Sequence, residues 1–203
     1  MAATFWTSDY REENITNPKR NFRFKVTIGA FGEDSGSDLG STTVFWAKTA
    51  SKPEFTLGET THNYLNHTFK FPGRVTWSDV TITMVDPGGT KGVAYALTKI
   101  LNESGYSIPG VDNFHTISKS KAVSGLGQVL VEQIDHQGTK LESWTLNNAF
   151  IADAKFGSLD YGSDDLTEYS ITVRYDWATY NEDAEGEVAY EAVATGNGIT
   201  TGT

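Results

Sequence analysis

The strongest pattern in the sequence is a strict alternation of apolar and polar residues in two segments, 22–30 and 169–177. Successive side chains of a strand point to opposite faces, so both segments predict long strands with one apolar and one wet face. Residues rich in β-branched and aromatic side chains predict further strands. Within residues 75–85 the apolar residues change from odd to even positions, and a bulge at residues 78–79 would explain the change. The strand segments expected from the sequence are 21–31, 41–50, 61–71, 75–85, 128–136, 140–151 and 168–178.

Helical spacing is expected in one segment only, residues 90–104. Val93, Leu97 and Ile100 recur there at the period of a helix, after the breaker sequence Asp-Pro-Gly-Gly at 86–89. Thr90 is expected to cap this helix, and Gly105 stands where a helix-ending glycine belongs. The sequence at 135–138 predicts a hairpin turn. Residues 105–127 show no clear period, and a loop of that length is usually functional or ordered by a partner.

These elements predict a mostly β fold within one domain. The expected architecture is a β-sandwich or barrel-like domain of antiparallel strands with one packed α-helix. We expect an N-terminal arm at 1–20, the β domain at 21–180, and an acidic C-terminal extension at 181–203. The extension holds five carboxylates and no basic residue, and it is expected to be solvated or to dock on a partner.

Composition disfavours several classes of function. Sixteen basic against 26 acidic residues give a net charge of −10, which disfavours tight wrapping of nucleic acid. The absence of cysteine excludes disulfides and thiolate chemistry. No apolar run approaches the roughly 20 residues of a membrane span, so no membrane anchor is expected. The first twenty residues lack the apolar core of a secretory signal, so synthesis in the cytosol is expected.

The sequence predicts no catalytic residue, no metal site and no cofactor. The four histidines occur singly, and His62 and His67 are expected on opposite faces of one strand. The glycine-rich run at 124–127 precedes a strand, which is the wrong context for a phosphate cradle. Two acidic clusters, one at 33, 34 and 38 and one at 160, 164 and 165, lack the spacing of a calcium loop and predict turns. A hydrolase with dispersed carboxylates is the least supported alternative.

The polar faces of the two long strands are also compatible with assembly of several copies into a ring. A long strand with a free edge is an aggregation template unless it is paired. Strands that pair between copies could close a ring-shaped barrel around a water-filled lumen, and such rings could stack into a tube. An ordinary sandwich with one solvated sheet explains the same periodicity.

Four segments in order carry a resemblance to a known family. Residues 17–28 (NPKRNFRFKVTI) form a polar arm leading into a strand, and residues 45–53 (FWAKTASKP) form a strand ending in a proline turn. Residues 71–83 (FPGRVTWSDVTIT) form the strand before the helix. Residues 146–151 (LNNAFI) and 165–176 (DLTEYSITVRYD) form the closing strands. Together they resemble the inner tail-tube protein of contractile-tailed bacteriophages, whose fold is related to the type VI secretion tube protein.

The resemblance covers about residues 17–180 and implies a structural role. It implies a virion protein of the tail, made in the host cytoplasm, that forms hexameric rings stacked into a hollow, largely negative conduit for DNA delivery into the host. Its implied partners are further copies of itself and the sheath, baseplate and tape-measure proteins, with genomic DNA passing through unbound. The alternative is a monomeric β-sandwich module that binds a ligand such as carbohydrate through aromatics, with Trp46, Trp77, Trp144 and Trp177 as candidates.

Two sets of residues are candidates for the tube's surfaces. The first set is the apolar side chains at the start of and within the excursion 56–73, which exceed what a free loop should expose. They are expected to contact another subunit or ring, or else to belong to a hairpin that lies on its own domain. The second set is the carboxylates on or beside the long strands, which are expected to face the lumen or to be ordinary solvated positions. The inter-subunit candidates are Phe55, Leu57, Tyr64, Leu65 and Phe69, and the lumen candidates are Glu132, Glu142, Glu168 and Asp176.

Overall fold

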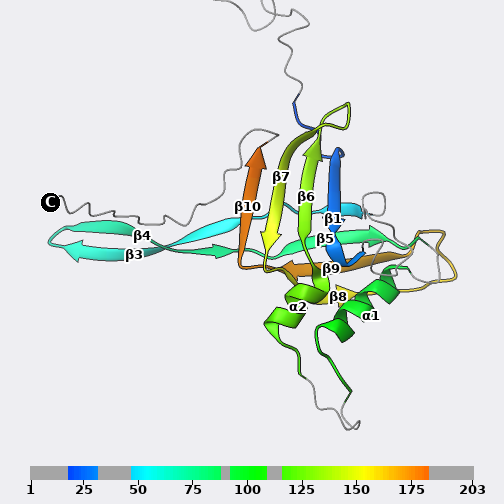
Figure 1. The fold of residues 1–203 in the computed structure, drawn as a ribbon. Helices are drawn as coiled ribbons and strands as arrows, with labels where there is room; N and C mark the ends of the chain where they lie inside the picture. Colours follow the sequence, from blue (N-terminus) through cyan, green and yellow to red (C-terminus); the bar gives the residue numbers. More distant parts are fainter. Residues whose placement is uncertain (1–17, 32–46, 88–91, 109–115, 183–203) are drawn as a thin grey trace, which may run out of the picture.

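A computed structural model of the protein describes residues 18–31, 47–87, 92–108 and 116–182. Within these ranges the chain forms antiparallel sheets and two α-helices (Figure 1). The mostly β, antiparallel fold expected from the sequence is confirmed. The expected cap Thr90, the cluster at 33–38, Trp46, and most of the arm and of the acidic extension lie outside the described residues.

Sheet A contains four strands in the order β1-β6-β7-β10. Val26 and Ile28 of its first strand are fully buried, and they lie beside Val131 and Val129 in the ladder. The same face continues through Leu146 of the third strand, so one side of the sheet belongs to the core. The bounds of the strands are Phe24–Ile28 for β1, Val129–Ile134 for β6, Lys140–Asn147 for β7 and Trp177–Glu182 for β10.

Sheet B contains the strands β2-β5-β9-β8. In Figure 1 its strands run across those of sheet A, and the apolar faces of the two sheets enclose the core. Val80, Ile82 and Met84 are buried on this face, and Ile171 and Val173 lie beside them. The strands are Ala47–Ala50 for β2, Val80–Val85 for β5, Phe150–Lys155 for β8 and Glu168–Arg174 for β9.

Two helices contribute apolar side chains to the core, and Figure 1 shows them beside β8. Helix α1, Val93–Glu103, buries four apolar residues, and Gly105 follows it with a φ of +93°. Helix α2, Lys119–Leu126, begins at Ser118, whose hydroxyl accepts a hydrogen bond from the Lys121 amide. A short 3₁₀ turn, η2 (Gly29–Phe31), follows β1 and contacts both helices.

A long β-hairpin leaves the body of the molecule. Strands β3, Phe55–Tyr64, and β4, His67–Trp77, pair along their length and turn at residues 65–66, where Leu65 adopts a φ of +51°. In Figure 1 the hairpin projects past β10, on the side of sheet A away from β1. Every hairpin residue except Trp77 is exposed, so the hairpin packs mainly on itself.

The bounds of several predicted strands differ from those of the structure. The segment 21–31 forms a strand only over Phe24–Ile28, and the segment 168–178 is divided between β9 and β10, which belong to different sheets. The segment 61–71 contains the hairpin turn, so His62 and His67 lie on paired strands rather than on one strand. The parity change at residues 78–79 is the junction between β4 and β5, not a bulge within one strand.

The structure confirms that a helix lies within 90–104 and that a hairpin turn lies at 135–138. The helix begins at Val93 with Gly92 as its N-cap, and β6 and β7 are joined through Asp135. The prediction of one helix was wrong, because residues 105–127 contain α2. Within the described residues, neither sheet of a single chain closes into a barrel.

Candidate assembly surfaces

The first candidate surface is the pair of outer strands of sheet A, β1 and β10. Each pairs within the sheet on one side only, β1 with β6 and β10 with β7. Neighbouring strands are antiparallel throughout, so β1 and β10 run in opposite directions. The face of sheet A away from the core carries mainly polar side chains; Lys25, Thr27, Glu132, Thr145 and Thr179 belong to this face.

The second candidate surface is the hairpin. All five apolar residues expected to contact another subunit lie on it and are exposed, from Phe69 at 45% to Leu65 at 88%. Phe71 and Val75 are exposed beside them and were missed, although alternation along the second half of the excursion could have found them. The structure therefore gathers the five predicted residues on one element.

The register of the hairpin shifts once. Leu57 pairs with Val75, whereas Glu59 pairs with Pro72, so β4 carries one extra residue there. A Cβ on Gly73 would lie 3.1 Å from the carbonyl carbon and oxygen of Gly58. A side chain at position 73 would therefore push the two backbones apart by a few tenths of an ångström.

An apolar groove lies where the base of the hairpin meets the start of β10. Phe55, Val75, Trp77 and Trp177 line this open groove of about 540 Å³. The rings of Phe55 and Trp77 stand edge to face, with centroids 5.4 Å apart. Carbohydrate sites combine an aromatic platform with polar groups that fix the sugar, and none of the four lining side chains carries a charge or a hydroxyl. The groove thus suits an apolar partner better than the carbohydrate of the alternative reading.

Glu142 is the most buried of the four lumen candidates. It lies beside Gln133 on the core side of sheet A, with only 6% of its surface exposed. Lys19 and Lys52 both form ion pairs with its carboxylate, and Lys52 also donates to Gln133 Oε1 at 2.8 Å. Burial raises the pKa of Glu142, but the hydrogen bonds from the two lysines outweigh burial and hold the pKa below its usual value. This cluster ties residue 19 of the arm to the segment that leads into the hairpin.

The other three candidate carboxylates also have basic partners. Glu132 lies opposite Lys25, with Nζ and Oε2 3.7 Å apart, and Glu168 pairs with Lys48. Asp176 accepts hydrogen bonds from Lys119 at 2.6 Å and from Asn148 at 2.9 Å, and these bonds lower its pKa. The four carboxylates do not form one cluster. Among them, only Glu132 lies on the face of sheet A away from the core.

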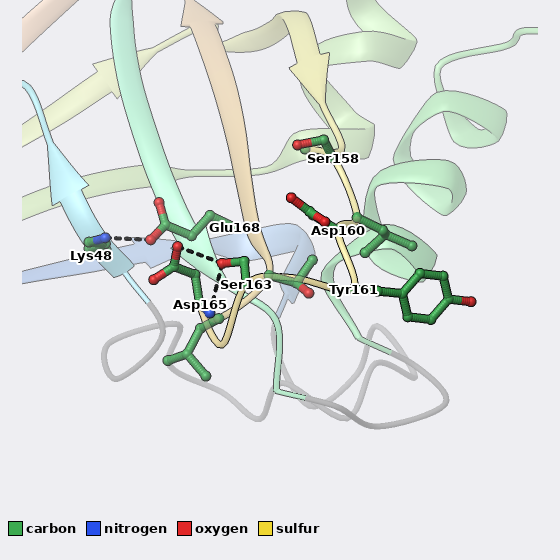
Figure 2. A pocket seen from close by; sticks show the side chains of 11 residues that line it. Lys48, Ser158, Asp160, Tyr161, Ser163, Asp165 and Glu168 are labelled. Carbon is green, nitrogen blue, oxygen red and sulfur yellow. Dashed lines mark hydrogen bonds and ion pairs between the residues drawn. The ribbon is translucent and has the colours of Figure 1, made fainter.

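An open depression of about 1070 Å³ lies along the β8–β9 loop, beside the Lys48–Glu168 ion pair (Figure 2). Its acidic residues support the loop: Asp160 accepts a hydrogen bond from the Gly162 amide at 2.9 Å, and Ser163 donates to Asp165 at 2.8 Å. Among the described residues, no group of three acidic or histidine side chains is placed to hold a metal ion. In the same residues, neither helix has the length and apolar character to cross a bilayer.

Chains with a similar fold occur among solved structures. A chain in the sheath/tube terminator structure of an extracellular contractile injection system matches with a TM-score of 0.58 and 19% identity, over 82% of this chain and 99% of that one. A chain of the corresponding sheath-tube complex matches with 0.55 and 18%, over 87% and 99%. A chain of the anti-feeding prophage baseplate matches with 0.57 and 13%, over 83% and 98%.

These likenesses define a class at the level of fold. The chain has the fold found in the assemblies of contractile injection systems, as the sequence resemblance led us to expect. No protein-family model matches the sequence, and no curated protein sequence matches it.

Proposed function

We propose that the protein is a structural, non-enzymatic subunit of the tube of a contractile injection apparatus such as a phage tail. Copies join into hexameric rings, the rings stack into a hollow tube, and the sheath, baseplate and tape-measure proteins are the partners. Genomic DNA is the proposed cargo, delivered through the tube of a virion. The fold shared with chains of sheath-tube assemblies supports this proposal.

The observation that carries the proposal is the layout of sheet A. It has four alternating strands, so its two outer strands are antiparallel to each other. When copies are related by rotation, β1 of one copy can pair with β10 of the next in the same antiparallel pattern that the sheet uses internally. An even number of strands keeps this alternation unbroken around the ring, and closure removes both free edges.

This arrangement places the strands that close the ring differently from the sequence expectation. The segment 168–178 was expected to supply the second edge, but β9 lies inside sheet B between β5 and β8. The edge belongs to β10, which follows β9 after Tyr175 and Asp176. A proline at Val173 would therefore disrupt the interior of sheet B and test folding rather than ring closure.

Ring closure also determines which face lines the lumen. Sheet B and the helices lie on the core side of sheet A, so the opposite face turns inward. Glu132 belongs to that face, whereas Glu142, Glu168 and Asp176 lie elsewhere in each subunit. A strongly negative lumen wall would then need further carboxylates. The acidic side chains within residues 183–203, which follow β10, are the nearest in the sequence.

The hairpin is the proposed contact to the adjacent subunit. It projects past β10, toward the place where the next copy of the ring would lie (Figure 1). Its ten-residue strand spans roughly 33 Å at about 3.3 Å per residue, which is long enough to extend well under a neighbour. Burial of its exposed aromatic side chains would contribute to assembly through the hydrophobic effect.

Negative-stain electron microscopy of the purified protein tests the proposal, with rings or hollow filaments as the expected result. Hydrogen exchange before and after assembly then locates the contact. Alternate amides of β1 and β10 face the free edge and are expected to gain protection, while amides of β9 serve as the internal control. A protein that stays monomeric at high concentration, without rings or filaments, contradicts the proposal.

A further inference from the structure

Among the described residues, the apolar groove at the base of the hairpin is open. Phe55, Val75 and Trp177 line it and keep 54%, 51% and 44% of their surfaces exposed. Trp177 is also the first residue of β10, so the groove is continuous with the edge that the proposed ring would use. Large aromatic and aliphatic side chains gathered in a concave site are typical of the central part of a protein interface.

Strand direction determines what a neighbouring copy brings to this groove. This step rests on the proposed ring. Antiparallel pairing of the neighbour's β1 with β10 places the end of β1 at the start of β10. The core-side residues of β1 are Phe24, Val26 and Ile28, and those of β10 are Ala178 and Tyr180.

The register follows from the requirement that core-side residues stay on the core side. It pairs Ile28 with Ala178 and Val26 with Tyr180, which uses all five residues of β1. A slip by one residue would turn every apolar side chain of β1 to the wet face, so it is disfavoured. In this register Gly29 of the neighbour lies opposite Trp177, and the turn η2 follows at the mouth of the groove.

We propose that the groove formed by Phe55, Val75, Trp77 and Trp177 binds the η2 turn, Gly29–Phe31, of the adjacent copy in the ring. The turn carries no charge; Gly29 is exposed, and Ala30 is half-buried against the core of its own subunit. An uncharged turn matches a groove without charged lining residues. The hairpin base and the strand edge therefore form one continuous contact, and each copy donates a turn on one side and a groove on the other.

Cross-linking tests this contact directly, because the protein contains no cysteine. Two single variants, Ala30→Cys and Val75→Cys, are purified separately, mixed, assembled and treated with a short bismaleimide. A covalent heterodimer is expected. In the double variant, a ladder of covalent oligomers up to the closed ring is expected. The matched control replaces Val75→Cys with Leu65→Cys at the hairpin tip, and the heterodimer is expected to disappear.

A second pair of variants measures the contribution of the groove. Val75 and Thr76 are adjacent exposed residues on opposite faces of β4. Val75→Glu is expected to raise the subunit concentration needed for ring assembly at least tenfold, while Thr76→Glu leaves that concentration close to the wild-type value. Both variants are expected to melt within about 2 °C of the wild type, since exposed substitutions cost little.

The outcomes separate this inference from the proposed function. Rings seen by microscopy without the Ala30–Val75 cross-link, or with Val75→Glu assembling like the wild type, overturn the groove contact and leave the tube proposal standing. Absence of any ring in the wild-type protein overturns both. Rings that give the cross-link, with assembly weakened only by Val75→Glu, support both.

Discussion

The buried carboxylate of Glu142 offers the sharpest test of how the chain holds its arm and hairpin in place. Glu142→Gln keeps the shape of the side chain and removes its charge. The variant loses two charge-assisted hydrogen bonds, each worth about 1.5–3 kcal/mol when fully buried. Lys19 and Lys52 are about half exposed and can return to water, which reduces the loss. We expect a total of about 2 kcal/mol, or a fall of about 4–8 °C in Tm for a chain of this size.

The pH dependence of this effect has a definite sign. The pKa of Glu142 is lower in the folded state than in the unfolded chain, so its contribution is complete above the ordinary carboxyl pKa of about 4.3. The contribution is lost as the pH falls through the lowered folded-state pKa. The gap between wild type and variant should therefore be largest at neutral pH and shrink in acid.

Urea unfolding of both proteins from pH 7 down to pH 3 measures this gap. Glu132→Gln is the matched control, because its carboxylate pairs with a single lysine at 3.7 Å on the opposite face of the sheet. A partly exposed pair of this kind contributes about 0.2–1 kcal/mol. A gap for Glu142→Gln that is no larger than that of Glu132→Gln, or that does not change with pH, would refute the reasoning.

Three further predictions follow from burial and close contact. Burial raises the pKa of Tyr175 to about 12, so stability should fall between about pH 10 and 12 as the unfolded state ionises first, and Tyr175→Phe should lessen this fall in alkaline unfolding curves. Leu126→Ala should cost about 2–5 kcal/mol in urea unfolding, because Leu126 is fully buried in the core. Gly73→Ala should lower hydrogen-exchange protection within β3 and β4 with little change in global Tm, since its Cβ would crowd Gly58 in a projecting hairpin; a variant with unchanged protection would contradict this crowding.

The alternation of residues predicted strand positions better than strand ends. It found the core side of β1 because Val26 and Ile28 face the core over the whole strand. It could not detect the break between β9 and β10, because the apolar parity continues through Tyr175 to Trp177. Tyr175 stays buried at the corner while the chain changes sheets, so the pattern is the same as in a continuous strand.

Helix α2 was missed because the residues it buries are mostly small. Ala122 and Gly125 are buried along with Leu126, and a Cβ on Gly125 would stand 3.4 Å from the Ile100 carbonyl oxygen of α1. A helix that packs closely through small residues lacks a clear apolar stripe. Its termini were better signals, since Ser118 caps the helix and Gly127 ends it with a φ of +70°.

The exposure of the candidate hairpin side chains was also predictable. The exposed apolar side chains of the hairpin follow from the composition of residues 55–69, and the structure places them all on the projecting element. The lysine partners of the four carboxylates could not be found in advance. Lys19 and Glu142 are 123 positions apart, and only the packing of the arm against sheet A brings them together.

The junction between β9 and β10 has a mechanical consequence. Only Tyr175 and Asp176 separate the centre of sheet B from an outer strand of sheet A, and Asp176 is fastened to Lys119 of α2 and to Asn148. A force on β10 is therefore transmitted to sheet B through a connection of only two residues, and close-packed interiors transmit strain well. Load applied at one edge of the subunit is carried by its whole body rather than by a flexible linker.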